Sequence, residues 1–133
     1  MTMAQTSVDA GRLLRGALTF DAIGSALNGV AYLAGAGLLA RELGLPVALL
    51  VPLGAVLLGW TGVLLRIATR PRLSRRAGLA VVVLNAVWVV DSVALLASGV
   101  DPVTRAGEVW ILLQAALVAG VAALEYAGVR RLP

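Results

Sequence analysis

Residues 46–76 decide the fold, and they read PVALLVPLGAVLLGWTGVLLRIATRPRLSRR. The first 20 residues of this stretch carry no charge, and about 20 apolar residues are needed for one helix to cross a bilayer. Four arginines follow between residues 70 and 76. Because short arginine-rich loops stay on the cytoplasmic side of a membrane, the stretch predicts a transmembrane helix followed by a cytoplasmic loop.

Three other stretches have the same apolar character, so the sequence predicts four spans, at about residues 16–40, 46–67, 77–100 and 106–129. The connections are short, which makes consecutive helices antiparallel neighbours. We therefore expect residues 1–133 to form a single integral membrane domain of the all-α class. Its architecture would be a four-transmembrane-helix up-down-up-down bundle with a basic cytoplasmic loop at 68–76. Residues 1–8 are small or polar and predict a loose tail.

Composition supports a membrane protein and excludes several kinds of chemistry. Of the 133 residues, 60% are hydrophobic and 14% are charged, whereas soluble domains are about 25% charged. A soluble chain this short cannot enclose so much apolar surface, so the lipid bilayer is the expected partner. There is no cysteine and no histidine, which removes disulfides, thiol catalysis and the commonest zinc and haem ligand. We expect no metal and no cofactor.

The basic residues predict the orientation of the chain. All 11 are arginines, and only Arg41 and Arg105 lie in the connections expected on the outer side. The other nine lie in or beside the termini and the middle connection, namely Arg12, Arg15, Arg66, Arg70, Arg72, Arg75, Arg76, Arg130 and Arg131. The positive-inside rule therefore predicts a multi-pass protein of the plasma membrane with both termini in the cytoplasm. The net charge of +4 is explained as this topological signal, so no nucleic-acid partner is expected.

Small residues recur along the fourth span, where Ala115, Ala119, Ala123 and Ala127 are spaced by four. Helices in lipid associate through close packing, so such a row marks a helix–helix interface. This row of alanines could pack against another helix of the same bundle, or it could form a homo-oligomer through small-residue helix faces.

Polar residues inside the spans carry the functional signal. Polar groups in the hydrocarbon layer usually face the bundle interior and find partners there. Residues spaced by three, four or eleven share a helix face, and this spacing selects one stripe on the first, third and fourth spans. The predicted ligand-binding residues are Asp21, Ser25, Asn28, Asn85, Trp88, Asp91, Ser92, Gln114 and Glu125. Among them Asp91 is expected to lie deepest, with no cation at its level.

Three functions compete at this stage. The polar residues could form a cavity that binds or transports a small apolar or amphipathic molecule. They could instead bond to one another, or pair with Arg66, in a structural or accessory subunit of a membrane complex. The third option is an enzyme acting on a lipid-like substrate with Asp21, Asp91 or Glu125 as acid or base. No catalytic motif supports the enzyme, so a non-enzymatic role is favoured and no catalytic residue is assigned.

Two segments carry a family resemblance. Phe20-Asp21 precedes LNGVAYL at residues 27–33, and LNAVWVVDS occupies residues 84–92, followed later by Glu125 and GVRR at 128–131. With these segments the chain resembles small uncharacterised four-helix membrane proteins of actinobacterial type. The absence of lysine fits the high-GC genomes of such organisms. In size and span count the chain is also similar to DoxX-like four-helix proteins. The resemblance implies a four-helix membrane bundle and no established activity.

Overall fold

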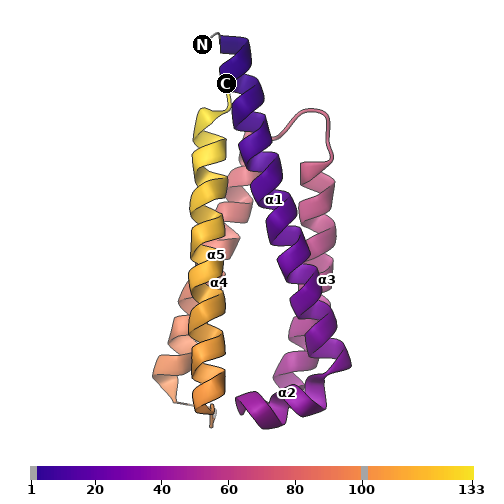
Figure 1. The fold of residues 1–133 in the computed structure, drawn as a ribbon, viewed down its shortest axis with the longest axis vertical. Helices are drawn as coiled ribbons and strands as arrows, with labels where there is room; N and C mark the ends of the chain where they lie inside the picture. The colour runs from indigo at the N-terminus through magenta and orange to yellow at the C-terminus, as the bar shows by residue number, and fades with distance from the viewer. Residues whose placement is uncertain (1–2, 100–101) are drawn as a thin grey trace.

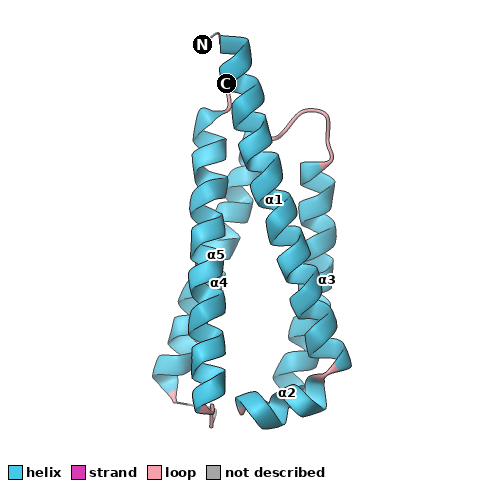
Figure 2. Ribbon diagram, in the orientation of Figure 1, coloured by secondary structure: helices cyan, strands magenta, loops and turns pink. Residues whose placement is uncertain are grey.

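In the computed structural model, residues 3–99 and 102–133 are described, and within them the chain forms five helices and no strand (Figures 1 and 2). The helices are α1 (Met3–Ala34), α2 (Ala36–Leu43), α3 (Val47–Ala68), α4 (Arg75–Ser98) and α5 (Arg105–Arg131). Of these, α3, α4 and α5 are each long and apolar enough to cross a membrane, and the bent pair of α1 and α2 makes a fourth candidate. The all-helical prediction is therefore confirmed.

The bounds of α3, α4 and α5 lie within two residues of the predicted spans, and residue 100 lies outside the described residues. The first span is different at both ends. Residues 3–8 are helical, so the predicted loose tail is wrong there, while residues 1 and 2 are not described. At the other end α1 stops at Ala34, and α2 turns by 95° across the end of the bundle. The break falls at Gly35 (φ −112°, ψ 21°), because glycine is a weak helix former and leaves the helical conformation easily.

The outer surface of the bundle is apolar. Only 17–33% of the residues in the most apolar windows of α3, α4 and α5 are buried inside the protein. Large side chains such as Phe20, Leu27 and Val90 are more than 60% exposed. Soluble monomers rarely expose contiguous apolar surfaces of this extent. Several long helices with apolar outer faces therefore indicate a multi-pass membrane protein.

Two helix pairs make up the bundle. Helix α1 packs along α3 and α4 packs along α5, and α1 also contacts α5, whereas α3 and α4 barely touch. Both termini and the α3–α4 loop lie at one end, and α2 crosses the other (Figure 1). A cluster around Leu14, Leu64 and Val129 closes the first end. A second cluster, around Leu50 and Ile111, joins α2 to α3 and α5 at the opposite end.

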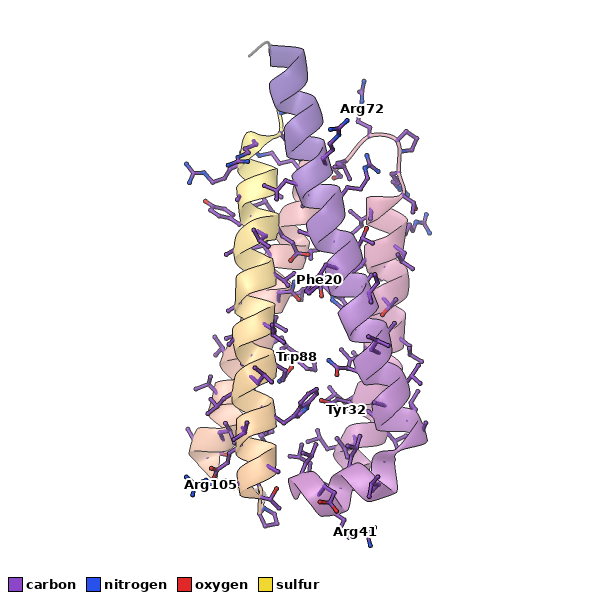
Figure 3. The ribbon with its side chains drawn as sticks, viewed as in Figure 1. Phe20, Tyr32, Arg41, Arg72, Trp88 and Arg105 are labelled. Carbon is purple, nitrogen blue, oxygen red and sulfur yellow. The ribbon has the colours of Figure 1, made fainter. Side chains whose placement is uncertain are left out.

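Arginines divide between the two ends as the sequence predicts. Arg72 lies at the end that holds the termini, called the arginine-rich end below, and Arg41 and Arg105 lie at the opposite end (Figure 3). Arg15 stabilises the arginine-rich end by donating hydrogen bonds to the carbonyls of Ala68 and Arg70, which lie at and just beyond the C-terminus of α3. Unpaired carbonyls at a helix C-terminus attract cations, so this contact ties α1 to α3.

Glycines allow α1 and α3 to approach closely. A Cβ atom added to Gly54 would lie 2.9 Å from the Gly29 carbonyl oxygen, and one added to Gly29 would lie 3.0 Å from that of Gly54. Both neighbours are backbone atoms, so they can move only with their helices. The contact therefore sets the distance between the two helices, as small residues do in membrane bundles.

We predict that Gly54→Ala lowers the free energy of unfolding by about 1–3 kcal/mol, the usual effect of overpacking. Gly59→Ala is the matched control, because an added Cβ there meets nothing within 4 Å. The control should be neutral or slightly stabilising, since alanine is the better helix former. Unfolding followed by circular dichroism in detergent measures both variants. Equal stabilities would contradict the assigned role of the α1–α3 contact.

Candidate ligand-binding site

A buried polar cluster joins three helices near the middle of the bundle. The Nδ2 group of Asn85 on α4 donates to Oδ2 of Asp21 on α1 at 2.8 Å and to Oε1 of Glu125 on α5 at 2.7 Å. Ser25 Oγ donates to Asp21 Oδ1 at 3.4 Å. We call Asp21, Ser25, Asn85 and Glu125 the inner polar cluster; all four are buried, and Glu125 is completely so. Both N–H donors of Asn85 are used to hold the two carboxyl groups.

The inner polar cluster has two carboxyl groups and no basic partner among the described residues. Oε2 of Glu125 has no hydrogen-bond partner among the described residues. The predicted alternative, a pair with Arg66, is wrong because Arg66 is exposed. Arg15, the arginine nearest to Asp21 along α1, is directed to backbone carbonyls. The two carboxyl groups are therefore held by the neutral donors of Asn85 and Ser25 rather than by a basic side chain.

A second set of polar contacts lies further toward the opposite end. Trp88 Nε1 donates to Gln114 Oε1 at 2.9 Å, and Gln114 Nε2 donates to Ser92 Oγ at 3.3 Å. We call Trp88, Ser92 and Gln114 the outer polar cluster. Beyond it, Trp110 Nε1 donates to the Tyr32 hydroxyl at 2.9 Å, which links α5 to α1. The polar groups in this half of the bundle are thus largely satisfied by one another.

A cavity of about 410 Å³ lies against both clusters. All four long helices contribute to its wall. Its polar and tryptophan lining consists of Asp21, Ser25, Asn28, Trp60, Asn85, Trp88, Trp110 and Gln114. The remaining wall is apolar, with Leu57 and Val121 among its buried members. An apolar cavity of this size with a few converging polar groups is the usual form of a small-molecule site.

Several lining residues are exposed, and they show where the cavity opens. Phe20 and Leu27 on α1 and Leu117 on α5 are each more than half exposed, as are Val56 on α3 and Leu84 on α4. Helices α3 and α4 barely touch, so they leave one side of the bundle open. In Figure 3 the side chains of Tyr32 and Trp88 are visible between α1 and α5. The cavity therefore opens sideways between helices, toward the apolar outer surface.

The structure brings together most of the residues predicted from sequence. Six of the nine line the cavity, namely Asp21, Ser25, Asn28, Asn85, Trp88 and Gln114. Ser92 and Glu125 do not line it, but each is hydrogen-bonded to a residue that does. Whether any of them binds a ligand stays a prediction.

Asp91 is different, because its side chain is exposed on the outside of α4. Its place among the predicted cavity residues is therefore wrong, since it does not line the cavity. At 3.6 residues per turn, Asp91 is about 60° from Trp88 around the helix, whereas Asn85 and Ser92 lie on the other side of Trp88. Asn85 and Ser92 face inward, so Asp91 is turned away from the cavity.

Two lining residues were not assigned to the site from the sequence. Trp60 and Trp110 are absent from the predicted set, yet both line the cavity with Trp88. All three tryptophans of the chain thus line the same cavity. The sequence gives no sign that the three tryptophans lie close together, because they come from three different helices and meet only when the helices pack.

Comparison with known protein families, with curated proteins and with solved structures finds no match for this chain. The resemblance to four-helix proteins of actinobacterial type, and the more distant DoxX-like similarity, therefore stay predictions.

We predict that Asn85→Ala lowers the free energy of unfolding by about 1–3 kcal/mol, because it leaves two buried carboxyl groups without their shared donor. Asn28→Ala removes the same amide group from a position with no hydrogen bond among the described residues, and it should change stability less. Chemical unfolding in detergent compares the two variants. An Asn85→Ala protein as stable as the Asn28→Ala protein would show that the inner polar cluster does not stabilise the bundle.

Proposed function

We propose that this chain is a four-span membrane protein that binds a small amphipathic molecule in the cavity and takes it up sideways from the lipid. Asn28 is the observation that carries the proposal. Its half-buried side chain lines the cavity and has no hydrogen-bond partner among the described residues. Polar groups within a membrane bundle are normally paired. An amide that is free in a largely apolar cavity is therefore available to the polar end of a ligand.

The lining favours an amphipathic ligand, which has a polar end and an apolar end. Polar groups gather at Asp21, Asn28 and Asn85, whereas the sideways openings are lined by exposed apolar side chains such as Leu27 and Leu117. A molecule already dissolved in lipid would reach the cavity without crossing water. Its apolar part would stay among the apolar side chains while its polar end reached the inner polar cluster.

The proposal includes an orientation in the plasma membrane. Nine arginines in or beside the termini and the α3–α4 loop, against two at the opposite end, favour cytoplasmic termini. The inner polar cluster would then lie nearer the cytoplasm than the outer polar cluster.

A structural subunit is the second candidate, and Asp91 favours it. A carboxyl group on the outside of a membrane helix is costly in lipid, which would favour a partner that covers it. Ala119 and Ala123 are exposed on α5 and offer a close-packing face for the same purpose. Isolation from native membranes as a lone monomer would count against this role.

We predict that bromooctanol quenches the tryptophan fluorescence of the protein in lipid nanodiscs in a saturable way, because all three tryptophans line the cavity. Gly24→Leu should abolish saturable quenching. Gly24 lines the cavity, and an added Cβ there meets nothing within 4 Å, so a larger side chain can leave the helix at this point and occupy the cavity. Gly16→Leu is the control, since Gly16 is exposed on the same helix, away from the cavity. Quenching that rises without limit, or that is unaffected by Gly24→Leu, would contradict the proposed binding site.

The orientation can be tested separately, because the chain contains no cysteine. We predict that a membrane-impermeant maleimide labels Glu42→Cys in intact cells. It should label Arg72→Cys only in inverted membrane vesicles. Both side chains are exposed. Glu42 belongs to α2, which crosses one end of the bundle (Figure 1), and Arg72 lies at the other end (Figure 3). The reverse pattern would refute the cytoplasmic placement of the termini.

A further inference from the structure

The inner end of the cavity has more hydrogen-bond acceptors than donors. Asp21 and Glu125 contribute four carboxyl oxygens and Asn85 adds its amide oxygen. The hydrogen-bond donors within the cluster are the amide of Asn85 and the hydroxyl of Ser25. One oxygen of the buried Glu125 receives no hydrogen bond within the described structure. Asp21, which lines the cavity, is therefore available to a ligand group that carries a hydrogen-bond donor or a positive charge.

No described arginine neutralises the cluster from any of the helices around it. On α1, Arg12 is exposed and Arg15 donates to backbone carbonyls. Arg66 on α3 is exposed, and so are Arg75 and Arg76 in the first turn of α4. On α5 the arginines 105, 130 and 131 are exposed near the helix ends. Among the described side chains, Asp21 and Glu125 are the buried charged ones.

The tryptophans make the wall suitable for a cation. The indole N–H groups of Trp88 and Trp110 already donate to Gln114 and Tyr32. These two residues thus offer a ligand their ring surfaces, and Trp60 contributes a third indole from α3. The face of an indole ring attracts cations, and the attraction is larger when the cation is desolvated.

We propose that the ligand is a lipophilic organic cation, an amine or quaternary ammonium whose charged end contacts Asp21 and whose apolar body lies among the three tryptophans. This inference rests on the proposed function, because it assumes that the cavity binds a ligand. Asp21 lines the cavity and meets the cation directly. Glu125 lies behind it, and the same amide of Asn85 holds both carboxyl groups.

The two carboxyl groups of the cluster lie side by side, since that of Glu125 lies next to that of Asp21. The faces of α3 and α4 toward the cluster bring no described charge. A bound cation would therefore be the positive charge nearest to both carboxyl groups.

The test compares three probes that share one terminally brominated octyl chain and differ in their head group: bromooctyl trimethylammonium, bromooctanol and bromooctanoate. Tryptophan quenching is measured with the full chain in nanodiscs of zwitterionic lipid, which do not attract the cation by surface charge. We expect the cation to bind about tenfold more tightly than the alcohol. The anion should bind more weakly than either. Asp21→Asn should bring the cation and the alcohol to similar affinities.

Asp91→Asn is the matched control, because it removes a carboxyl group that faces away from the cavity and should leave the preference unchanged. If the alcohol binds as tightly as the cation and Gly24→Leu blocks both, the cation inference fails and the proposed binding site stands. If no probe quenches in a saturable way, both fail. If Asp91→Asn abolishes the preference as strongly as Asp21→Asn, the cation is attracted by overall charge and the assignment to Asp21 is overturned. Because the three probes are compared on the unmodified chain, the inference stays testable even where a variant does not fold.

Discussion

The shared amide of Asn85 is the interaction on which the middle of the bundle depends. It holds Asp21 of α1 and Glu125 of α5 at the same time, so one side chain of α4 joins both helix pairs. Helix α3 supplies no member of this cluster and barely touches α4. The pairs are thus joined by apolar clusters toward their two ends, by the inner polar cluster and by the Trp110–Tyr32 hydrogen bond. A bundle joined in this way stays open along part of its length.

The distribution of polarity is inverted relative to that of a soluble protein. Buried positions hold Asp21, Asn85 and Glu125, while Phe20 and Leu27 face outward. In lipid there is no hydrophobic force to press the helices together, so packing and interhelical hydrogen bonds do that work. Measured interhelical hydrogen bonds in a membrane protein average only about 0.6 kcal/mol. The Gly29–Gly54 approach and the apolar clusters therefore matter as much to this fold as its polar contacts.

Much of the fold could be predicted because its signals are local. Apolar length defines α3, α4 and α5, and residue spacing places Asp21, Ser25 and Asn28 on one face. The bend at Gly35 could not be seen, since the apolar run continues through it and the turn depends on how α2 packs at the opposite end. Asp91 was misplaced because spacing gives an angle around a helix but not the direction of the interior. Trp60 was missed because its role depends on residues from three other helices.

A ligand in the cavity would act on the fold as well as fill space. Asn28 belongs to the α1–α3 pair, whereas Trp88 and Gln114 belong to the α4–α5 pair, and all three line the cavity. A molecule that contacted both groups would add a connection where the helix pairs have few of their own. Any ligand that binds only the folded state stabilises it in proportion to the logarithm of its concentration over Kd. Occupancy and the mutual position of the two helix pairs are therefore coupled. The inner polar cluster would take part in that coupling, because Asn85 already joins Asp21 of one pair to Glu125 of the other.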